Sequence, residues 1–189
     1  MSKFTVLFDA CVLYPAPLRD LLVQLATTEL FRAKWTEEIH EEWVSSVLEK
    51  RQDLSRDQLE RTKYLMNAAV LDCVVEGYEY IIPTLSLPDK DDRHVLAAAI
   101  HGKCDAIVTF NKKDFPVSEI SKYNIEIIHP DDFVSYQFDL DKAASLNSVQ
   151  ACRKRLSSPS VNADNYLETL LRQSLTKTVS VLRPYSKII

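Results

Sequence analysis

Glycine is almost absent from this chain of 189 residues, which contains only Gly77 and Gly102. Two isolated glycines exclude the P-loop and the Gly-x-Gly-x-x-Gly turn, and with them the nucleotide-cofactor folds built on those motifs. Long apolar runs are missing as well, since no stretch approaches the roughly 18 residues of a membrane span and no signal peptide opens the chain. We therefore expect a cytoplasmic protein with no membrane contact.

Paired cysteines are absent too. The four cysteines lie far apart in the sequence, at Cys11, Cys73, Cys104 and Cys152. Without a Cys-x-x-Cys pair, neither a structural zinc site nor a disulfide framework is expected, and reduced thiols fit a cytosolic protein.

The charge is unevenly distributed along the chain, whose formal net charge is −4. Residues 139–189 contain eight Lys or Arg and four Asp or Glu, a net charge of +4, so residues 1–138 carry −8. An acidic body with a basic tail is not typical of a protein that coats a nucleic acid duplex. Such a protein can still cut nucleic acid if cations neutralise its acidic site.

Apolar runs and helical patterns alternate through the first two thirds of the chain. Strands are expected at Lys3–Phe8, Val70–Val75, Asp105–Thr109 and Ile125–Ile128. Helices are expected at Leu18–Phe31, from the N-cap Thr36 to Lys50, from the capping box of Ser55 and Gln58 to Ala69, from Asp92 to His101, and from Pro130 to Tyr136. This order predicts a three-layer α/β/α fold around a mainly parallel sheet of about 4–5 strands.

The alternation stops at Asp139, and the remaining sequence is helical. Amphipathic patterns at Asp141–Leu156, Asn162–Gln173 and Thr176–Leu182 follow one another with no strand between them. We therefore divide the chain into an α/β body, residues 1–138, and a helical C-terminal extension, residues 139–189, packed on that body.

Acidic and amide side chains stand where the predicted strands and one helix meet the same edge of the sheet. Asp9 directly follows the first strand, and Asn111 and Asp114 follow the strand that ends at Thr109. Asp92 begins a helix whose apolar stripe it also heads, so its carboxylate is expected to be partly buried. In an open parallel sheet ligands collect at the carboxyl ends of the strands. The spacing therefore predicts one site.

Carboxylates gathered without matching Lys or Arg repel one another, and the usual resolution is a hard divalent cation such as Mg²⁺ or Mn²⁺. One or two such ions can activate water, orient a phosphodiester and stabilise the leaving oxygen. An acid-only site of this kind favours metal-dependent hydrolysis of phosphodiesters.

Each aspartate also has a simpler interpretation. Asp9 suits a turn after a strand, Asp91 or Asp92 can cap the following helix, and Asp114 before Phe115 fits ordinary turn chemistry. The hypothesis rests on their coincidence at strand and helix ends, because each signal alone is weak.

The second helix contributes a further candidate. Glu42 lies about 60° beyond Ile39 on the helical wheel, at the margin of the buried face, so a solvated position competes with a role as ligand. Glu38 occupies the same row and is the rival of Glu42.

Several polar residues lie beside these acids. His94 and His101 fall on the polar side of their helix and are expected at the surface. Arg93, Lys112 and Lys113 are candidate contacts for substrate phosphates, with solvated positions as the simpler interpretation.

Four segments resemble the PIN domain. They are the strand ending in Asp (VLFDACVLY), an acid-bearing helix (EIHEEWVSSVL), LPDKDDRHVLAAAI, and the strand and turn IVTFNKKDF. The resemblance covers roughly residues 1–138, and within the family it is closest to the VapC-like toxins of bacterial type II toxin–antitoxin pairs. The helical tail is similar to an extension found in one subgroup.

The resemblance implies an Mg²⁺-dependent endoribonuclease, with Mn²⁺ as a possible substitute. It assigns metal binding and catalysis to Asp9, Glu42 and Asp92. The family often has Asp or Asn at the position of Asn111, so the resemblance leaves the role of a fourth acid to Asp114 or to a water, and the number of ions stays open. Thr109 would orient the metal ligands and Asp89 would add an acid at the rim.

The implied reaction is an in-line attack by water that leaves a 5′-phosphate. Implied partners are an RNA substrate, an antitoxin that inserts an Arg or Lys among the carboxylates, and a second copy of the chain in a homodimer. A phosphatase of the haloacid dehalogenase type needs a second Asp where Cys11 stands. A non-catalytic PIN-fold scaffold and a housekeeping RNA-processing nuclease remain alternatives.

Overall fold

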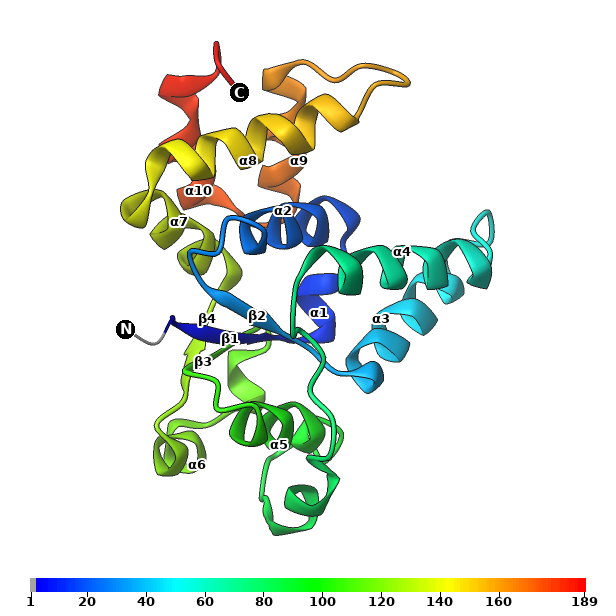
Figure 1. Ribbon diagram of the computed structural model, residues 1–189, viewed down its shortest axis with the longest axis vertical. Coiled ribbons are helices and arrows are strands. Elements are labelled where there is room, and N and C mark those ends of the chain that lie inside the picture. Colours follow the sequence, from blue (N-terminus) through cyan, green and yellow to red (C-terminus); the bar gives the residue numbers. More distant parts are fainter. Residues whose placement is uncertain (1–2) are drawn as a thin grey trace.

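Four parallel strands form the centre of the computed structural model, which describes residues 3–189 (Figure 1). In spatial order they are β2 (Arg32–Lys34), β1 (Thr5–Phe8), β3 (Ala106–Val108) and β4 (Glu126–Ile128). Every residue of β1 and β3 is buried, because these two strands lie in the middle of the sheet. The predicted α/β class with a parallel sheet is confirmed.

The edge strand β2 is not predicted by the sequence pattern, and the strand predicted at Val70–Val75 is wrong. Only Val74 of that segment pairs with the sheet region, in an isolated bridge to Trp35. β2 is 3 residues long, with only Ala33 fully buried, so it lacks the apolar run that identifies β1.

The first long helix, α2 (Ala16–Ala26), ends five residues before the predicted end at Phe31. The hydroxyls of Thr27 and Thr28 donate to backbone carbonyls of the preceding turn, and Glu29 has a φ of 60°. This left-handed residue redirects the chain into β2, since a helix cannot continue through such a backbone conformation.

The predicted helix starts at Thr36 and Ser55 are confirmed. Thr36 Oγ1 accepts a hydrogen bond from the Ile39 amide, and Ser55 forms a complete capping box with Gln58. Further helices are α1 (Ala10–Leu13), α3 (Glu37–Lys50), α4 (Arg56–Ala69), α5 (Arg93–His101), α6 (Val117–Ile120), α7 (Pro130–Leu140), α8 (Lys142–Arg155), α9 (Ala163–Arg172) and α10 (Thr176–Leu182).

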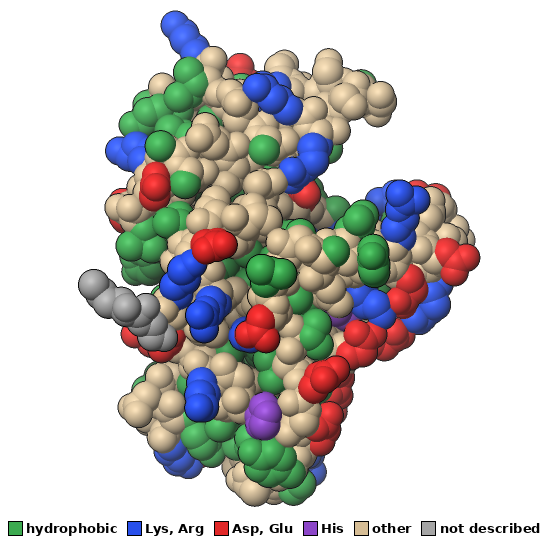
Figure 2. Space-filling model, in the orientation of Figure 1, with side chains coloured by type: hydrophobic (Ala, Val, Ile, Leu, Met, Phe, Trp, Pro, Cys, Tyr) green, Lys and Arg blue, Asp and Glu red, His purple; other side chains and the backbone are tan. Residues whose placement is uncertain are grey.

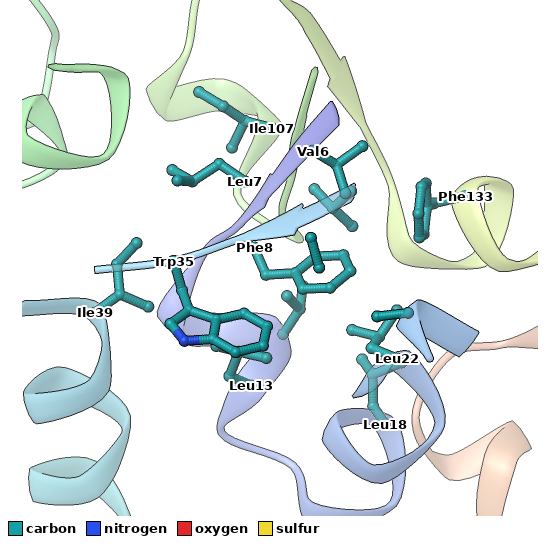
Figure 3. Close-up of a cluster of buried hydrophobic side chains, with 14 of the residues drawn as sticks. Val6, Leu7, Phe8, Leu13, Leu18, Leu22, Trp35, Ile39, Ile107 and Phe133 are labelled. Carbon is teal, nitrogen blue, oxygen red and sulfur yellow. The ribbon is translucent and has the colours of Figure 1, made fainter. Parts of the chain in front are cut away.

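The sheet lies between two helical layers, with α5 on one side and α2 and α7 on the other (Figure 1). Phe8 of β1 points toward the side of Leu18 and Phe133, whereas Leu7 lies with Ile107 on the opposite side (Figure 3). This alternation follows from the two-residue period of a strand. Both faces of the sheet are therefore covered by apolar side chains.

Trp35 and Trp43 are fully buried, as expected for core residues. Val95, Leu96 and Ala99 form the predicted buried stripe of α5. On α4, Leu59 and Met66 are buried, whereas 55% of Leu65 is exposed.

The C-terminal helices pack on the body, as predicted. α8 lies against α2 and α7, and α10 lies against α7 (Figure 1). Arg155 of α8 pairs with Asp20 of α2 at 3.1 Å. The helix α7 runs continuously past residue 138 to Leu140, so the two predicted parts share one helix, and the division itself stays a prediction.

Across residues 3–189, no helix combines the length and the apolar character needed to cross a bilayer.

Candidate metal-binding active site

Asp9 lies at the carboxyl end of the central strand β1, and only 4% of it is exposed. The Thr109 hydroxyl donates to Asp9 Oδ2 over 2.6 Å, and the Cys11 thiol donates to the same oxygen over 3.1 Å. Thr109 follows β3 and accepts a hydrogen bond from the Asn111 amide. The Asp9 carboxylate is therefore held in a fixed orientation by side chains from two neighbouring strand ends.

Cys11 supports this arrangement as a neutral thiol. Burial, together with the charge of Asp9, raises the pKa of Cys11 to about 12. The group therefore keeps its proton at neutral pH and can donate it to the Asp9 carboxylate. A thiolate ligand for a soft metal is not expected here.

Asp92 precedes α5 but does not cap it, since it has helical backbone angles and makes no side-chain capping bond. Burial is the largest cause that raises the pKa of Asp92 to about 7, and the charges of Asp9, Asp114 and Asp89 contribute in the same direction. Carboxylates remote in sequence thus act on one another at the carboxyl edge of the sheet. Without a cation, this repulsion is relieved by a proton on Asp92.

We use the name acid cleft for the group of Asp9, Asp92, Asp114 and Asp89, because the charges of the other three act on Asp92. We use rim for the residues next to Asp114 and Asp89 in the sequence. Asp114 ends the 3₁₀ turn Lys112–Asp114 and is half-buried, whereas Lys112 and Lys113 are exposed. The Asn111 side chain is exposed as well.

The segment before α5 contributes the other side of the rim. Asp89 is exposed, and its Oδ1 accepts a hydrogen bond from the Asp91 amide. The guanidinium of Arg93 donates to the Lys90 carbonyl. Arg93 is half-buried, whereas Lys112 and Lys113 are exposed.

Glu42 is brought to the cleft through His94. Glu42 Oε1 lies 2.9 Å from His94 Nε2, and Glu38 Oε2 lies 3.5 Å from His94 Nδ1. Both glutamates come from α3, one helical turn apart, whereas His94 comes from α5 two residues after Asp92. Glu38, the rival candidate, also accepts a hydrogen bond of 2.9 Å from the Tyr78 hydroxyl.

The expectation that His94 lies at the surface is wrong, since only 5% of it is exposed. Burial alone lowers the pKa of His94, but its contact with Glu42 and the charges of Glu42, Glu38 and Asp9 outweigh burial and raise that pKa above the ordinary value. Ala97 and Ala98 flank His94 on the helical wheel, and both are buried. These alanines were the signal that this face of α5 is also covered.

The donors present fit a hard cation. Oxygen atoms of acids dominate the cleft, and the raised pKa of Asp92 shows charge that the protein itself leaves uncompensated. Within residues 3–189, no three His, Cys, Asp or Glu side chains already stand in the geometry of a finished ligand sphere. The fit to Mg²⁺ or Mn²⁺ therefore rests on donor chemistry and charge.

Comparisons with known proteins match both parts of the chain. The model of the PIN domain family matches residues 5–113, and the model described as VapC50 C-terminal domain matches residues 130–184. A protein named "Putative ribonuclease VapC50" from Mycobacterium tuberculosis (strain ATCC 25618 / H37Rv) is 44% identical over 79 residues, which cover 40% of this chain and 46% of that relative. The match thus spans about half the length of the relative. No significant match was found among solved structures.

Proposed function

The chain belongs to the PIN domain family, and we propose that it is a divalent-cation-dependent endoribonuclease acting in the cytoplasm as the toxin of a toxin–antitoxin pair. In this proposal the α/β body, residues 1–138, cuts the RNA. The extension, residues 139–189, covers the body and offers further surface to RNA or protein.

One observation carries the proposal, namely the placement of Asp92 before α5 with no capping bond, among acids that include the buried Asp9 at the end of β1. Burial and these neighbouring acids raise the pKa of Asp92 to about 7. A carboxylate that only caps a helix would gain hydrogen bonds and a lowered pKa. Asp92 has neither, so its position favours a bound cation over helix capping.

Asp9 and Asp92 are the residues proposed to hold the cation, assisted by Asp114 and Glu42. A bound Mg²⁺ or Mn²⁺ would supply a Lewis acid for the phosphate. It would also lower the pKa of a water bound to it, so that hydroxide forms more readily at neutral pH. Thr109 and Cys11 both donate hydrogen bonds to Oδ2 of Asp9. The other carboxylate oxygen, Oδ1, is therefore the one proposed to bind the cation.

The chain's own residues account for binding and orientation of the RNA. Lys112 and Lys113 directly precede Asp114 and Arg93 directly follows Asp92, and these three are proposed to contact phosphates on either side of the scissile bond. A half-buried acid such as Asp114 is suited to orient the attacking water and accept its proton.

The proposed inhibitor is an antitoxin that places an Arg or Lys in the acid cleft. Such a side chain would satisfy the carboxylates in place of the cation. A small neighbouring gene that encodes a DNA-binding protein would support this pairing. Its absence, with nuclease activity retained, would support a housekeeping RNA-processing enzyme.

The test is cleavage of a structured RNA by wild type, Asp9→Asn and Asp139→Asn, all purified in the same way. Asp139 is exposed on α7, and Asp139→Asn therefore controls for the loss of one negative charge. We expect wild type and Asp139→Asn to cut with Mg²⁺ or Mn²⁺, to stop in EDTA, and Asp9→Asn to be inactive. Equal activity of wild type and Asp9→Asn would instead identify a contaminant and favour a scaffold role.

A further inference from the structure

His94 joins two helices at the mouth of the acid cleft. It lies on α5, and it contacts both acids that α3 directs toward the cleft, Glu42 at 2.9 Å and Glu38 at 3.5 Å. α3 and α5 come from distant parts of the sequence, and α5 lies below the sheet in Figure 1 with α3 to the right of it. Figure 2, in the same orientation, shows acidic side chains gathered on this right-hand side. The contacts of His94 therefore fix the position of α3 carboxylates relative to Asp92.

The two glutamates need such a partner. Glu38 and Glu42 are four residues apart on one helix, where like charges repel each other. Their side chains are 50% and 41% exposed. Glu38 is held by the Tyr78 hydroxyl, whereas Glu42 has, among residues 3–189, only its contact with His94 to keep it from turning into solvent. A donor between them counters both tendencies.

The second ring nitrogen of His94, Nδ1, is buried and has no hydrogen-bond partner among the described residues. Glu38 Oε2 lies nearest at 3.5 Å, too far for a normal hydrogen bond. Buried polar atoms are rarely left in this way in the absence of a role.

We infer that His94 is a positioning residue, which holds Glu42 through Nε2 in the orientation needed to bind the cation, while Nδ1 faces Glu38. This inference rests on the proposed function. Glu42 is the functional partner, and Glu38, tied to the Tyr78 hydroxyl at 2.9 Å, fixes the other side of the ring.

Two amide substitutions at His94 distinguish the roles of its two ring nitrogens. The side-chain NH₂ of Gln reaches about as far as Nε2, and that of Asn about as far as Nδ1. His94→Gln therefore retains a donor to Glu42, whereas His94→Asn retains one only toward Glu38. The two variants share the loss of the ring, so each is the control for the other's effect on folding.

The readout is the affinity for Mn²⁺ alone, measured from the electron paramagnetic resonance signal of the free ion. We expect His94→Asn and His94→Ala to weaken binding about 10–100-fold, as for other residues that orient metal ligands, and His94→Gln to remain within about threefold of wild type. Thermal midpoints of the Gln and Asn variants should agree with each other.

A Glu42→Gln background tests the pathway of the effect. There, His94→Asn should cause no further loss of Mn²⁺ affinity, because the group that His94 positions no longer binds as an anion. If Gln and Asn at position 94 weaken binding equally, or if the loss persists undiminished in Glu42→Gln, the inference is wrong.

Asp9→Asn in the same titration keeps the two proposals distinguishable. Loss of Mn²⁺ binding in Asp9→Asn, with His94 variants unchanged, would overturn only the role of His94. Mn²⁺ binding that Asp9→Asn does not change would overturn the proposed function itself.

Discussion

Two aspartates near helix N-termini show how differently this protein treats a partly buried carboxylate. Asp131, in the first turn of α7, is 4% exposed and accepts hydrogen bonds from the amides of Lys177 and Thr178 and from the Thr176 hydroxyl. Burial by itself raises the pKa of Asp131, but these hydrogen bonds reverse the effect and lower it. Asp92, at the start of α5, has no such donors and a pKa raised to about 7.

The difference is the one we expect between a structural acid and the proposed binding acid. Asp131 joins α7 to α10 and is satisfied by the protein alone. Asp92 lies among Asp9, Asp114 and Asp89, and the folded chain leaves it unfavourably charged. Proteins tolerate such local destabilisation mainly at functional sites. The comparison predicts that changes at the two acids will have opposite consequences.

The largest expected effect is on catalysis at the cleft. Asp9→Asn should reduce RNA cleavage by about 10³-fold or more, in the range seen when a residue central to catalysis is replaced. Its free energy of unfolding without metal should change by less than about 2 kcal/mol, because the weakened hydrogen bonds from Thr109 and Cys11 are offset by the removal of one repelling charge. Single-turnover cleavage and urea unfolding of the same preparation measure both quantities. If Asp9→Asn loses activity only because it unfolds, Asp9 is a structural acid and not a catalytic one.

The structural acid should behave in the reverse way. Asp131→Asn is expected to lower the free energy of unfolding by about 2–3 kcal/mol, the range for hydrogen bonds to a charged group, and to leave Mn²⁺ affinity unchanged. Urea unfolding and Mn²⁺ titration test the two parts. If Asp131→Asn binds Mn²⁺ more weakly than wild type under conditions where both proteins are fully folded, Asp131 is not a purely structural acid.

The pH dependence of this loss has a defined sign. The pKa of Asp131 is lowered in the folded state, so its contribution is complete above the unfolded value near 4 and is lost as pH falls through the folded value. The difference in free energy of unfolding between wild type and Asp131→Asn should therefore be constant above about pH 5 and should narrow below about pH 4.

A smaller effect of opposite sign is expected at Asp92. Its folded pKa, about 7, lies above the ordinary value of 3.8 for an aspartate, so the ionised carboxylate destabilises the metal-free fold as pH rises between these values. Asp92→Asn should stabilise the protein in EDTA at pH 8 by about 1–2 kcal/mol, after allowance for solvent screening. The gain should disappear near pH 4.

Mn²⁺ supplies the control for Asp92→Asn. The ion should stabilise wild type much more than the variant, because it binds the folded carboxylate cluster. If Asp92→Asn is less stable than wild type in EDTA at pH 8, the carboxylate is not under repulsion.

The smallest effect is expected at the surface contact between body and extension. Arg155 and Asp20 are about half exposed, at 48% and 47% of their side chains. Arg155→Ala should cost less than about 1 kcal/mol, as is usual for exposed ion pairs. Thermal unfolding at low and high salt measures the contribution. A larger loss would show that this pair, in addition to Asp131, fixes the extension to the body.

Sequence patterns predict the buried parts of this fold well, because their signals are local. The apolar run at β1 and the caps Thr36 and Ser55 each depend on a few adjacent residues. β2 depends instead on its pairing with β1, and its three residues, Arg32–Lys34, have no strand pattern of their own. Tertiary pairing therefore decides what local propensity leaves open.

The candidate site shows the same limit. Asp9 and Asp92 are predictable because each stands at the end of an element. His94 is not, since its burial depends on neighbours distant in sequence, among them Glu42 and Glu38 of α3, and the helical pattern alone placed it in solvent. The contact between His94 and Glu42 also explains why Glu42, at the margin of its helix, is directed to the cleft.

The most direct test of one shared cation site is a crystal structure grown or soaked with Mn²⁺, with the ion located by its anomalous scattering. We predict a peak within about 2.0–2.4 Å of carboxylate oxygens from both Asp9 and Asp92. A cleft without a peak, in a crystal that binds Mn²⁺ elsewhere, or a peak that contacts only one of the two aspartates, would contradict the account.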